Sequence, residues 1–548
     1  MLLLKLLKKE APKNWRKILF MAIASGIANG ALLAIINNGS SAASNDESKG
    51  LLLVLFTIAM GIFIVAKKWS LTQSTKLIEN ILRDLRIRFA DKIRKSELQI
   101  VENLGKGEVF TKVSQETNQI SQSSILIANA CQESIMLCFC LLYIAFLSFA
   151  AFFVTIGSMA IAIYIYFIHQ KGLEEDMNEL TNQEGQLLDS LSHLIDGFKE
   201  VRINSNKSDD VFKTFTQKTL ATEDSKININ VKIATDIMFS HVFFYFLIAV
   251  IVFLLPQFVP TYNDVVLKLT AALLFIVGPL EMIVACIPVM TRSNLALNNL
   301  FKLEKILDKN LPIEDEPNPA TLEKYFDFKE IDFKEVSFSY RDNLGESLFS
   351  VGPFDFNIKR GDTIFIIGGN GSGKSTVLKV LLGLYNRDNG SLSIDNQIIN
   401  NHSLTPFRNL FSTIFTDFHL FDKIYGIKDV DEEKINRLID EMDLTGKTSF
   451  KDGRFTNTHL STGQKKRLAL IIALMEDKPV YIFDEWAADQ DPHFRKHFYE
   501  TILKQLKSDG KTILAVTHDD HYFHHADRII KLDYGTVQEI KDRNDFKV

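Results

Sequence analysis

Long apolar runs fill roughly the first 300 residues of this 548-residue chain, whereas roughly the last 220 alternate apolar and charged positions in short segments. A helix that crosses a bilayer needs about 20 mostly apolar residues. The tract 125–168 is too long for one crossing and therefore predicts two helices joined by a tight turn. The runs together predict six spans, at 18–36, 51–66, 125–147, 151–168, 239–258 and 265–290.

Basic residues are concentrated on one side of these predicted spans. Lys67 and Lys68 follow the second span, and the connection 37–50 holds a single lysine. The first span is preceded by Lys5, Lys8, Lys9, Lys13, Arg16 and Lys17. Because cytoplasmic flanks are the basic ones, this pattern predicts a multi-pass protein with both termini in the cytoplasm.

Two long charged stretches with helical periodicity lie between the spans, at about 67–122 and 169–233. They are interpreted as membrane helices that extend far into the cytoplasm and return. A free-standing coiled coil is the alternative, which their place between spans disfavours. The resulting division is a transmembrane domain at 1–305, a linker at 306–325 and a soluble α/β domain at 326–548. The net charge of −5 gives no argument for nucleic-acid binding.

A phosphate-binding loop follows the apolar run 363–367 and precedes the apolar helix 377–382. The strand, the glycine-rich loop and the helix have the spacing G-x-x-x-x-G-K-S. Backbone N–H groups and the helix dipole then bind phosphate, Lys374 reaches the β- and γ-phosphates, and the Ser375 hydroxyl suits Mg²⁺. The loop, which predicts an ATP site, consists of Gly368, Gly369, Asn370, Gly371, Ser372, Gly373, Lys374, Ser375 and Thr376.

A predicted buried strand at 480–485 ends in two acidic residues, about 110 positions after the P-loop lysine. Asp484 is placed to hold Mg²⁺ through water, and Glu485 is placed to polarise the attacking water. His518 follows the apolar run 512–516, and Asp491 lies seven positions beyond Asp484. Both are expected beside the γ-phosphate.

A second phosphate-binding element precedes the apolar helix 468–475. Its residues are Leu460, Ser461, Thr462, Gly463 and Gln464. A hydroxyl and a glycine N–H at a helix N-terminus bind phosphate. Because one nucleotide needs only one such loop from a domain, this element is expected to cover the γ-phosphate of a partner subunit's ATP.

The order of these motifs resembles the nucleotide-binding domain of ABC transporters. Six spans fused N-terminal to such a domain resemble an ABC exporter half-transporter of the type I exporter fold, and the likeness covers essentially the whole chain. The resemblance implies that Tyr340 stacks on adenine and that 460–464 is the signature loop. It also implies a Walker B strand ending at Asp484, Glu485 as catalytic base with His518, and Asp491 in the D-loop.

Three departures narrow this resemblance. Thr416 stands where exporters carry a Gln that binds Mg²⁺, Thr462 replaces a glycine, and the D-loop region 485–492 reads EWAADQDP. The metal ligand is therefore expected to be Asp417, Thr416 or an added water, with the Asp417 carboxylate slightly favoured. The phrases FTDFHLFD, LSTGQKKRLAL and DEWAADQDP are similar to the cyclic-peptide and siderophore exporter group, which includes pyoverdine and syringomycin exporters.

The resemblance implies a homodimer in the bacterial inner membrane, with two ATP molecules in composite sites, Mg²⁺, and a small peptide-like amphipathic cargo moved by alternating access. A periplasmic adaptor is a possible further partner. The alternatives are a lipid or multidrug flippase of the same fold and a membrane-anchored regulatory ATPase that transports nothing.

Overall fold

The computed structural model describes residues 15–41, 49–169, 172–258, 265–309, 322–342 and 346–543. The N-terminal basic residues up to Lys13, part of the connection 37–50 and most of the linker 306–325 lie outside this description. The chain forms two compact units. The first contains residues 1–94 and 104–309, and the second contains residues 95–103 and 310–548.

The described residues of the first unit form helices and the short turns between them. In its described residues, six helices are long and apolar enough to cross a membrane, which confirms the predicted number of spans. Their apolar segments lie in α2 (Trp15–Ser41), α3 (Lys49–Lys95), α6 (Thr117–Leu147), α7 (Phe149–His169), α10 (Ser205–Ala249) and α12 (Val266–Lys309). The shorter elements are α5 (Lys106–Phe110), η3 (Thr111–Glu116), α8 (Leu173–Asp196), α9 (Phe198–Ile203), η4 (Val250–Leu254) and α11 (Leu255–Phe258).

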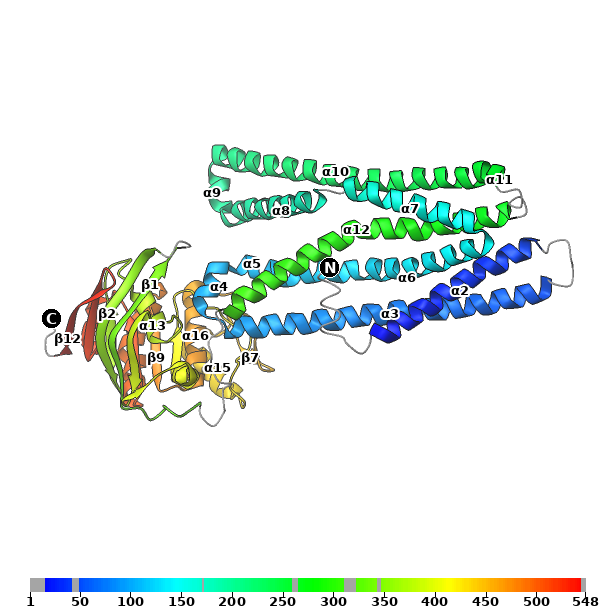
Figure 1. Ribbon diagram of the computed structural model, residues 1–548. Helices are drawn as coiled ribbons and strands as arrows, with labels where there is room; N and C mark the ends of the chain where they lie inside the picture. The colour runs from blue at the N-terminus through cyan, green and yellow to red at the C-terminus, as the bar shows by residue number, and fades with distance from the viewer. Residues whose placement is uncertain are drawn as a thin grey trace. The chain divides into compact units, whose positions relative to one another are not determined.

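Several of these helices continue far beyond their apolar segments. Helix α3 has 47 residues, α10 has 45 and α12 has 44, about twice what one crossing requires. Short α9 joins α8 and α10 into an antiparallel pair (Figure 1). The sequence predicts such extensions because charged stretches with helical periodicity adjoin the apolar runs. At one of these junctions the structure has two helices, since α7 ends at His169 and α8 begins at Leu173.

The first unit is held together differently along its length. Around Cys140, Ile144 and Leu273 the helices α6, α10 and α12 bury a continuous apolar core. Beyond the apolar segments, polar contacts take over: Lys92 Nζ of α3 lies 2.8 Å from Glu304 Oε1 of α12. Large apolar side chains on the span surfaces are exposed, as a bilayer-facing surface requires.

The second unit contains two main sheets. An antiparallel sheet has the order β2-β1-β4-β5, and a six-stranded sheet has the order β12-β11-β3-β10-β9-β6. The strands are β1 (Glu330–Arg341), β2 (Ser347–Lys359), β3 (Thr363–Ile367), β4 (Asn389–Ile394), β5 (Gln397–Ile398), β6 (Phe411–Ile414), β9 (Val480–Asp484), β10 (Thr512–Val516), β11 (Arg528–Asp533) and β12 (Thr536–Asp542). A separate hairpin is made by β7 (Phe450–Lys451) and β8 (Arg454–Phe455).

Helices cover the six-stranded sheet, which is parallel except for β12. They are α13 (Lys374–Leu381), α14 (Leu404–Arg408), α15 (Glu432–Glu441), α16 (Thr462–Glu476), α17 (Pro492–His497) and α18 (Leu503–Ser508), with the turns η7 (Asn401–Ser403), η8 (Trp486–Asp489), η9 (Phe498–Ile502) and η10 (Asp520–His525). The short helix α4 (Leu98–Leu104) largely belongs to this unit. Its Glu102 accepts a hydrogen bond from Lys379 Nζ at 2.8 Å, and Tyr385 also donates to it.

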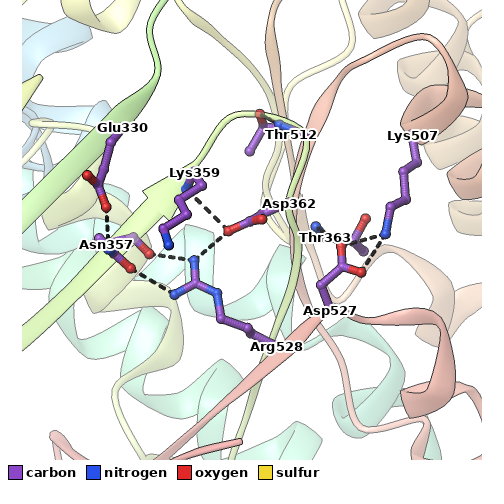
Figure 2. Close-up of polar contacts among 10 residues, drawn as sticks. Glu330, Asn357, Lys359, Asp362, Thr363, Lys507, Thr512, Asp527 and Arg528 are labelled. Carbon is purple, nitrogen blue, oxygen red and sulfur yellow. Dashed lines mark hydrogen bonds and ion pairs between the residues drawn. The ribbon is translucent and has the colours of Figure 1, made fainter. Parts of the chain in front are cut away.

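A polar cluster joins the two sheets (Figure 2). Arg528 of β11 donates to the side chain and the carbonyl of Asn357 in β2, at 2.9 and 2.7 Å, and to Asp362 Oδ2 at 2.6 Å. Asp527 accepts from the Thr363 N–H at 2.9 Å and from Lys507. Because the Arg528 side chain is only 15% exposed, these charge-assisted bonds are shielded from water.

We expect Arg528→Ala to destabilise the second unit by about 3 kcal/mol, because it leaves the half-buried Asp362 carboxylate without its cation. At roughly 2–4 °C per kcal/mol, the thermal midpoint of the soluble domain should fall by about 6–12 °C in scanning calorimetry of the detergent-solubilised chain. Arg341→Ala is the matched control, since that arginine is 54% exposed and lies 3.5 Å from Asp388. Equal shifts in the two variants would contradict the bridging role.

Candidate active site

The P-loop connects the end of β3 at Ile367 to the start of α13 at Lys374. Gly373 has φ +94°, and a Cβ atom there would lie 2.9 Å from Val351 Cγ1. At Gly368 a Cβ atom would lie 2.3 Å from the Leu532 carbonyl oxygen. These two positions therefore require glycine, which lets the backbone form a cradle for phosphate.

A cavity of about 430 Å³ opens over this loop. It is lined by Phe349, the loop residues 370–376 and Glu485. Lys374 is the buried cation of the cavity, and its Nζ donates to the carbonyls of Gly368 and Gly369 at 3.1 and 3.0 Å. A glycine cradle with a lysine at its base suits the triphosphate of ATP.

Two aromatic residues lie beside the loop. Tyr340 is the cross-strand partner of Phe349, and its hydroxyl lies 3.4 Å from Thr376 Oγ1 and 3.1 Å from Tyr385 Oη. Phe349 itself contacts the loop, with a ring carbon 3.3 Å from where a Gly373 Cβ would be. Phe349 is not predicted as a site residue from the sequence, because the signal for it is its strand register opposite Tyr340.

The acidic end of β9 meets the first turn of α13. Asp484 is 2% exposed, and its Oδ1 accepts from the Ser375 hydroxyl at 3.4 Å. Burial raises the pKa of Asp484, although hydrogen bonds from Thr416 and Ser375 oppose that rise. A carboxylate and a hydroxyl at this spacing are oxygen ligands that fit Mg²⁺.

Glu485 follows directly and has a left-handed backbone conformation, with φ +49°. Its Oε1 lies 3.2 Å from His518 Nε2 and 3.8 Å from Lys374 Nζ. Three residues that are far apart in the sequence are thus brought together at the cavity. A carboxylate between a cation and an imidazole can accept a proton from water positioned at the phosphate end.

Thr416 and Asp417 have different surroundings. The Thr416 hydroxyl donates to the Asp484 carbonyl at 3.1 Å. The Asp417 side chain is exposed and interacts electrostatically with Lys379. Thr416 is therefore the member of the pair that contacts the Walker B strand.

The signature element forms the N-terminus of α16. Ser461 caps that helix in a capping box with Gln464, whose N–H donates to Ser461 Oγ at 3.4 Å. Asp491 caps α17 by accepting from the Phe494 N–H at 2.9 Å. That hydrogen bond, together with Arg467, lowers the pKa of Asp491. Ser461, Gly463 and Asp491 are not among the described residues that line the P-loop cavity.

Comparison with known proteins agrees with this arrangement. Residues 351–488 match the family model described as ABC transporter. A solved bacterial Atm1-family ABC exporter with ATP bound has the same fold, with a TM-score of 0.78 at 18% identity. The alignment covers 97% of this chain and 96% of that one. The chain therefore has the fold of an ABC exporter half-transporter, in which six helices apolar enough to cross a membrane are followed by an ABC transporter ATPase domain.

Individual relatives differ in how much they share. ATP-binding protein SyrD of Pseudomonas syringae pv. syringae is 29% identical over 94% of this chain and 93% of that protein. The mitochondrial iron-sulfur clusters transporter ATM1 of Debaryomyces hansenii is 30% identical over 46% of this chain and 37% of its own length. The ATP-dependent lipid A-core flippase of Aliivibrio fischeri is 28% identical over 49% of this chain and 46% of its own length.

We expect Thr416→Ala to raise the Mg²⁺ concentration for half-maximal ATPase activity by about tenfold, because it removes the hydroxyl that contacts the Walker B strand. Asp417→Ala is the control and should leave this concentration nearly unchanged. Mg²⁺ titration of ATP hydrolysis by the purified chain measures both. A larger shift in Asp417→Ala would show that the carboxylate replaces the glutamine.

Proposed function

We propose that the chain works as a homodimer that exports a peptide-like amphipathic cargo across the bacterial inner membrane by alternating access. Both termini then lie in the cytoplasm, in keeping with the basic flanks of the first two spans. One observation carries the ATPase part of the proposal. The Glu485 carboxylate lies within 4 Å of both the Lys374 ammonium and the His518 imidazole, at the P-loop cavity. This intact arrangement disfavours a regulatory ATPase that moves nothing.

Each ATP in the proposed dimer is shared between two subunits. Lys374 and the loop 368–376 hold the triphosphate, Tyr340 stacks on the adenine, and Phe349 offers a second aromatic face. Ser375, Asp484 and Thr416 would hold Mg²⁺, and the metal would supply neutralisation of the phosphate charge. The helix cap at Ser461 lies away from this cavity lining and is available to a partner subunit's γ-phosphate.

Glu485 acts as the base in hydrolysis. Its carboxylate accepts a proton from the attacking water, and His518 at 3.2 Å orients that carboxylate. ATP shifts the protein toward the closed dimer only because it binds that state more tightly, and hydrolysis then resets the cycle.

Two observations support a peptide-like cargo. The phrases FTDFHLFD and DEWAADQDP are similar to the cyclic-peptide and siderophore exporter group, and SyrD is matched along nearly the whole of both chains. The first unit also has a cavity of about 810 Å³ between α6, α8, α10 and α12. Carboxamides of Gln119, Gln122 and Asn230 line it beside Leu126 and Met177. The charged residues Glu116, Glu184, Lys226 and Arg292 also line it, and most of its lining belongs to the polar helix extensions next to the apolar segments. Amides next to apolar side chains suit a molecule that has both peptide groups and lipophilic parts.

A lipid is the second candidate cargo, and the similarity to the lipid A-core flippase is the observation that favours it. The two candidates make different demands on the transporter. A flippase substrate needs only a route for a polar headgroup, whereas a peptide needs hydrogen-bonding groups along the route.

Inside-out vesicles that contain the chain should accumulate a labelled cyclic lipopeptide when ATP is added. Vesicles with Glu485→Gln, which keeps the shape of the base but removes its proton affinity, should bind ATP and accumulate none. ATP-dependent flipping of a labelled lipid without lipopeptide uptake would favour the second candidate. If neither the lipopeptide nor the lipid is transported although ATPase activity is normal, a regulatory ATPase would be favoured.

Mixed dimers test the shared ATP sites. A dimer of one Lys374→Ala subunit and one Ser461→Arg subunit has both defects in the same composite site, so one intact site remains. A dimer with both substitutions in one subunit and none in the other has a defect in each site. We expect nucleotide trapping of about one ATP per dimer in the first case and nearly none in the second. Equal nucleotide trapping in the two mixed dimers would contradict the shared ATP sites.

A further inference from the structure

Lys466 is a buried cation in the signature helix. It lies on α16, five residues after the cap Ser461, and is only 1% exposed. Lysine is almost never fully buried unless its charge is paired, because removing an ammonium from water is costly. Its partners therefore indicate what this position requires.

Outside its own helix, the described polar partners of Lys466 belong to the segment that begins at Glu485. Its Nζ donates to the Glu485 carbonyl at 2.7 Å and lies 2.8 Å from Asp489 Oδ2. Its own carbonyl accepts from Trp486 Nε1 at 2.9 Å. Three contacts thus fix residues 485–489 against the first turns of α16.

The backbone at Glu485 needs such support. Its φ of +49° and ψ of +37° lie in the left-handed region, which costs energy in a residue with a side chain. Such a conformation persists only where surrounding contacts hold it in place. The Lys466 ammonium holds the carbonyl that follows the Glu485 Cα, and the Glu485 N–H donates to the Val516 carbonyl at 3.1 Å.

The rest of the interface is also tight. A Cβ atom at Gly463 would lie 2.6 Å from the Asp489 carbonyl oxygen, so the two segments touch at backbone distance. Gln490 Nε2 donates to the Gly463 carbonyl at 3.1 Å, and Arg467 lies 2.6 Å from Asp491. The signature turn and residues 485–491 are therefore packed directly against one another.

We propose that Lys466 is a positioning residue that couples the two ATP sites of the dimer through each subunit. The inference rests on the shared sites proposed above. In that arrangement the cap of α16 contacts the partner's γ-phosphate, while Glu485 acts on its own subunit's ATP. Engagement of the cap shifts α16, and Lys466 transmits the shift to the backbone that carries the catalytic carboxylate.

The test compares Lys466→Met, which keeps the chain length and removes the charge, with Lys465→Met on the same helix turn. The full chain is reconstituted, and ATPase rate is measured against ATP concentration together with ATP affinity in the absence of turnover. We expect Lys466→Met to lower kcat by about tenfold, to change the ATP dissociation constant by less than about twofold, and to reduce the Hill coefficient toward 1. Lys465→Met should behave as wild type.

Asp489→Asn gives an independent reading, because its side chain is 45% exposed and the change keeps its shape. It weakens the ion pair and leaves the Lys466–carbonyl bond, so kcat and the Hill coefficient should fall in the same direction but less. This variant decides the question if Lys466→Met does not fold. Lower thermal stability with an unchanged Hill coefficient would overturn the coupling role and leave a structural brace.

A failure of the proposed shared ATP sites can be distinguished from a failure of the Lys466 coupling role. Wild-type kinetics with a Hill coefficient of 1, together with equal trapping in the two mixed dimers, would remove the shared sites and the coupling role with them. Cooperative wild-type kinetics that Lys466→Met and Asp489→Asn leave unchanged would remove the coupling role alone.

Discussion

The parallel pairing of β3, β10 and β9 is the constraint on which the active site depends. Val516 of β10 is aligned with Ile366 on one side and with Asp484 on the other. Because parallel strands end at the same edge of a sheet, the residues that follow them share one location. Lys374, Glu485 and His518 meet for this reason, although about 110 and 144 positions separate the lysine from the other two.

The features that the sequence predicts are those that depend on local spacing. Six spans follow from apolar runs of membrane length, and the P-loop follows from glycine spacing between a strand and a helix. Features that depend on tertiary pairing were missed. Phe349 reaches the P-loop through its register with Tyr340, and Lys466 is one of three consecutive basic residues that resemble a solvated charge run. Only the packing of residues 485–491 on α16 buries the middle one.

Shielded ion pairs link elements in both units. In the helical unit, Lys92 and Glu304 join α3 to α12 beyond the apolar segments, with side chains only 16% and 18% exposed. In the second unit, the charges of Arg528 and Lys466 are also shielded from solvent, and they link elements that share apolar cores. The buried ions therefore define geometry between sheets and between helix and turn, while apolar packing supplies most of the stability.

The unbroken length of α3 has a mechanical consequence. A helix of 47 residues is roughly 70 Å long at 1.5 Å per residue, and it ends at Lys95, where the chain enters the second unit. Such a rod bends little, so a tilt of about 5° at one end displaces the other end by roughly 6 Å over that length. In the proposed transport cycle, the direction of the α3 axis therefore matters more than a shift along that axis for passing changes at the ATP site to the membrane helices. Two glycines inserted midway along α3 would make the helix flexible at that point. We expect this change to uncouple ATP hydrolysis from transport without altering either end of the helix.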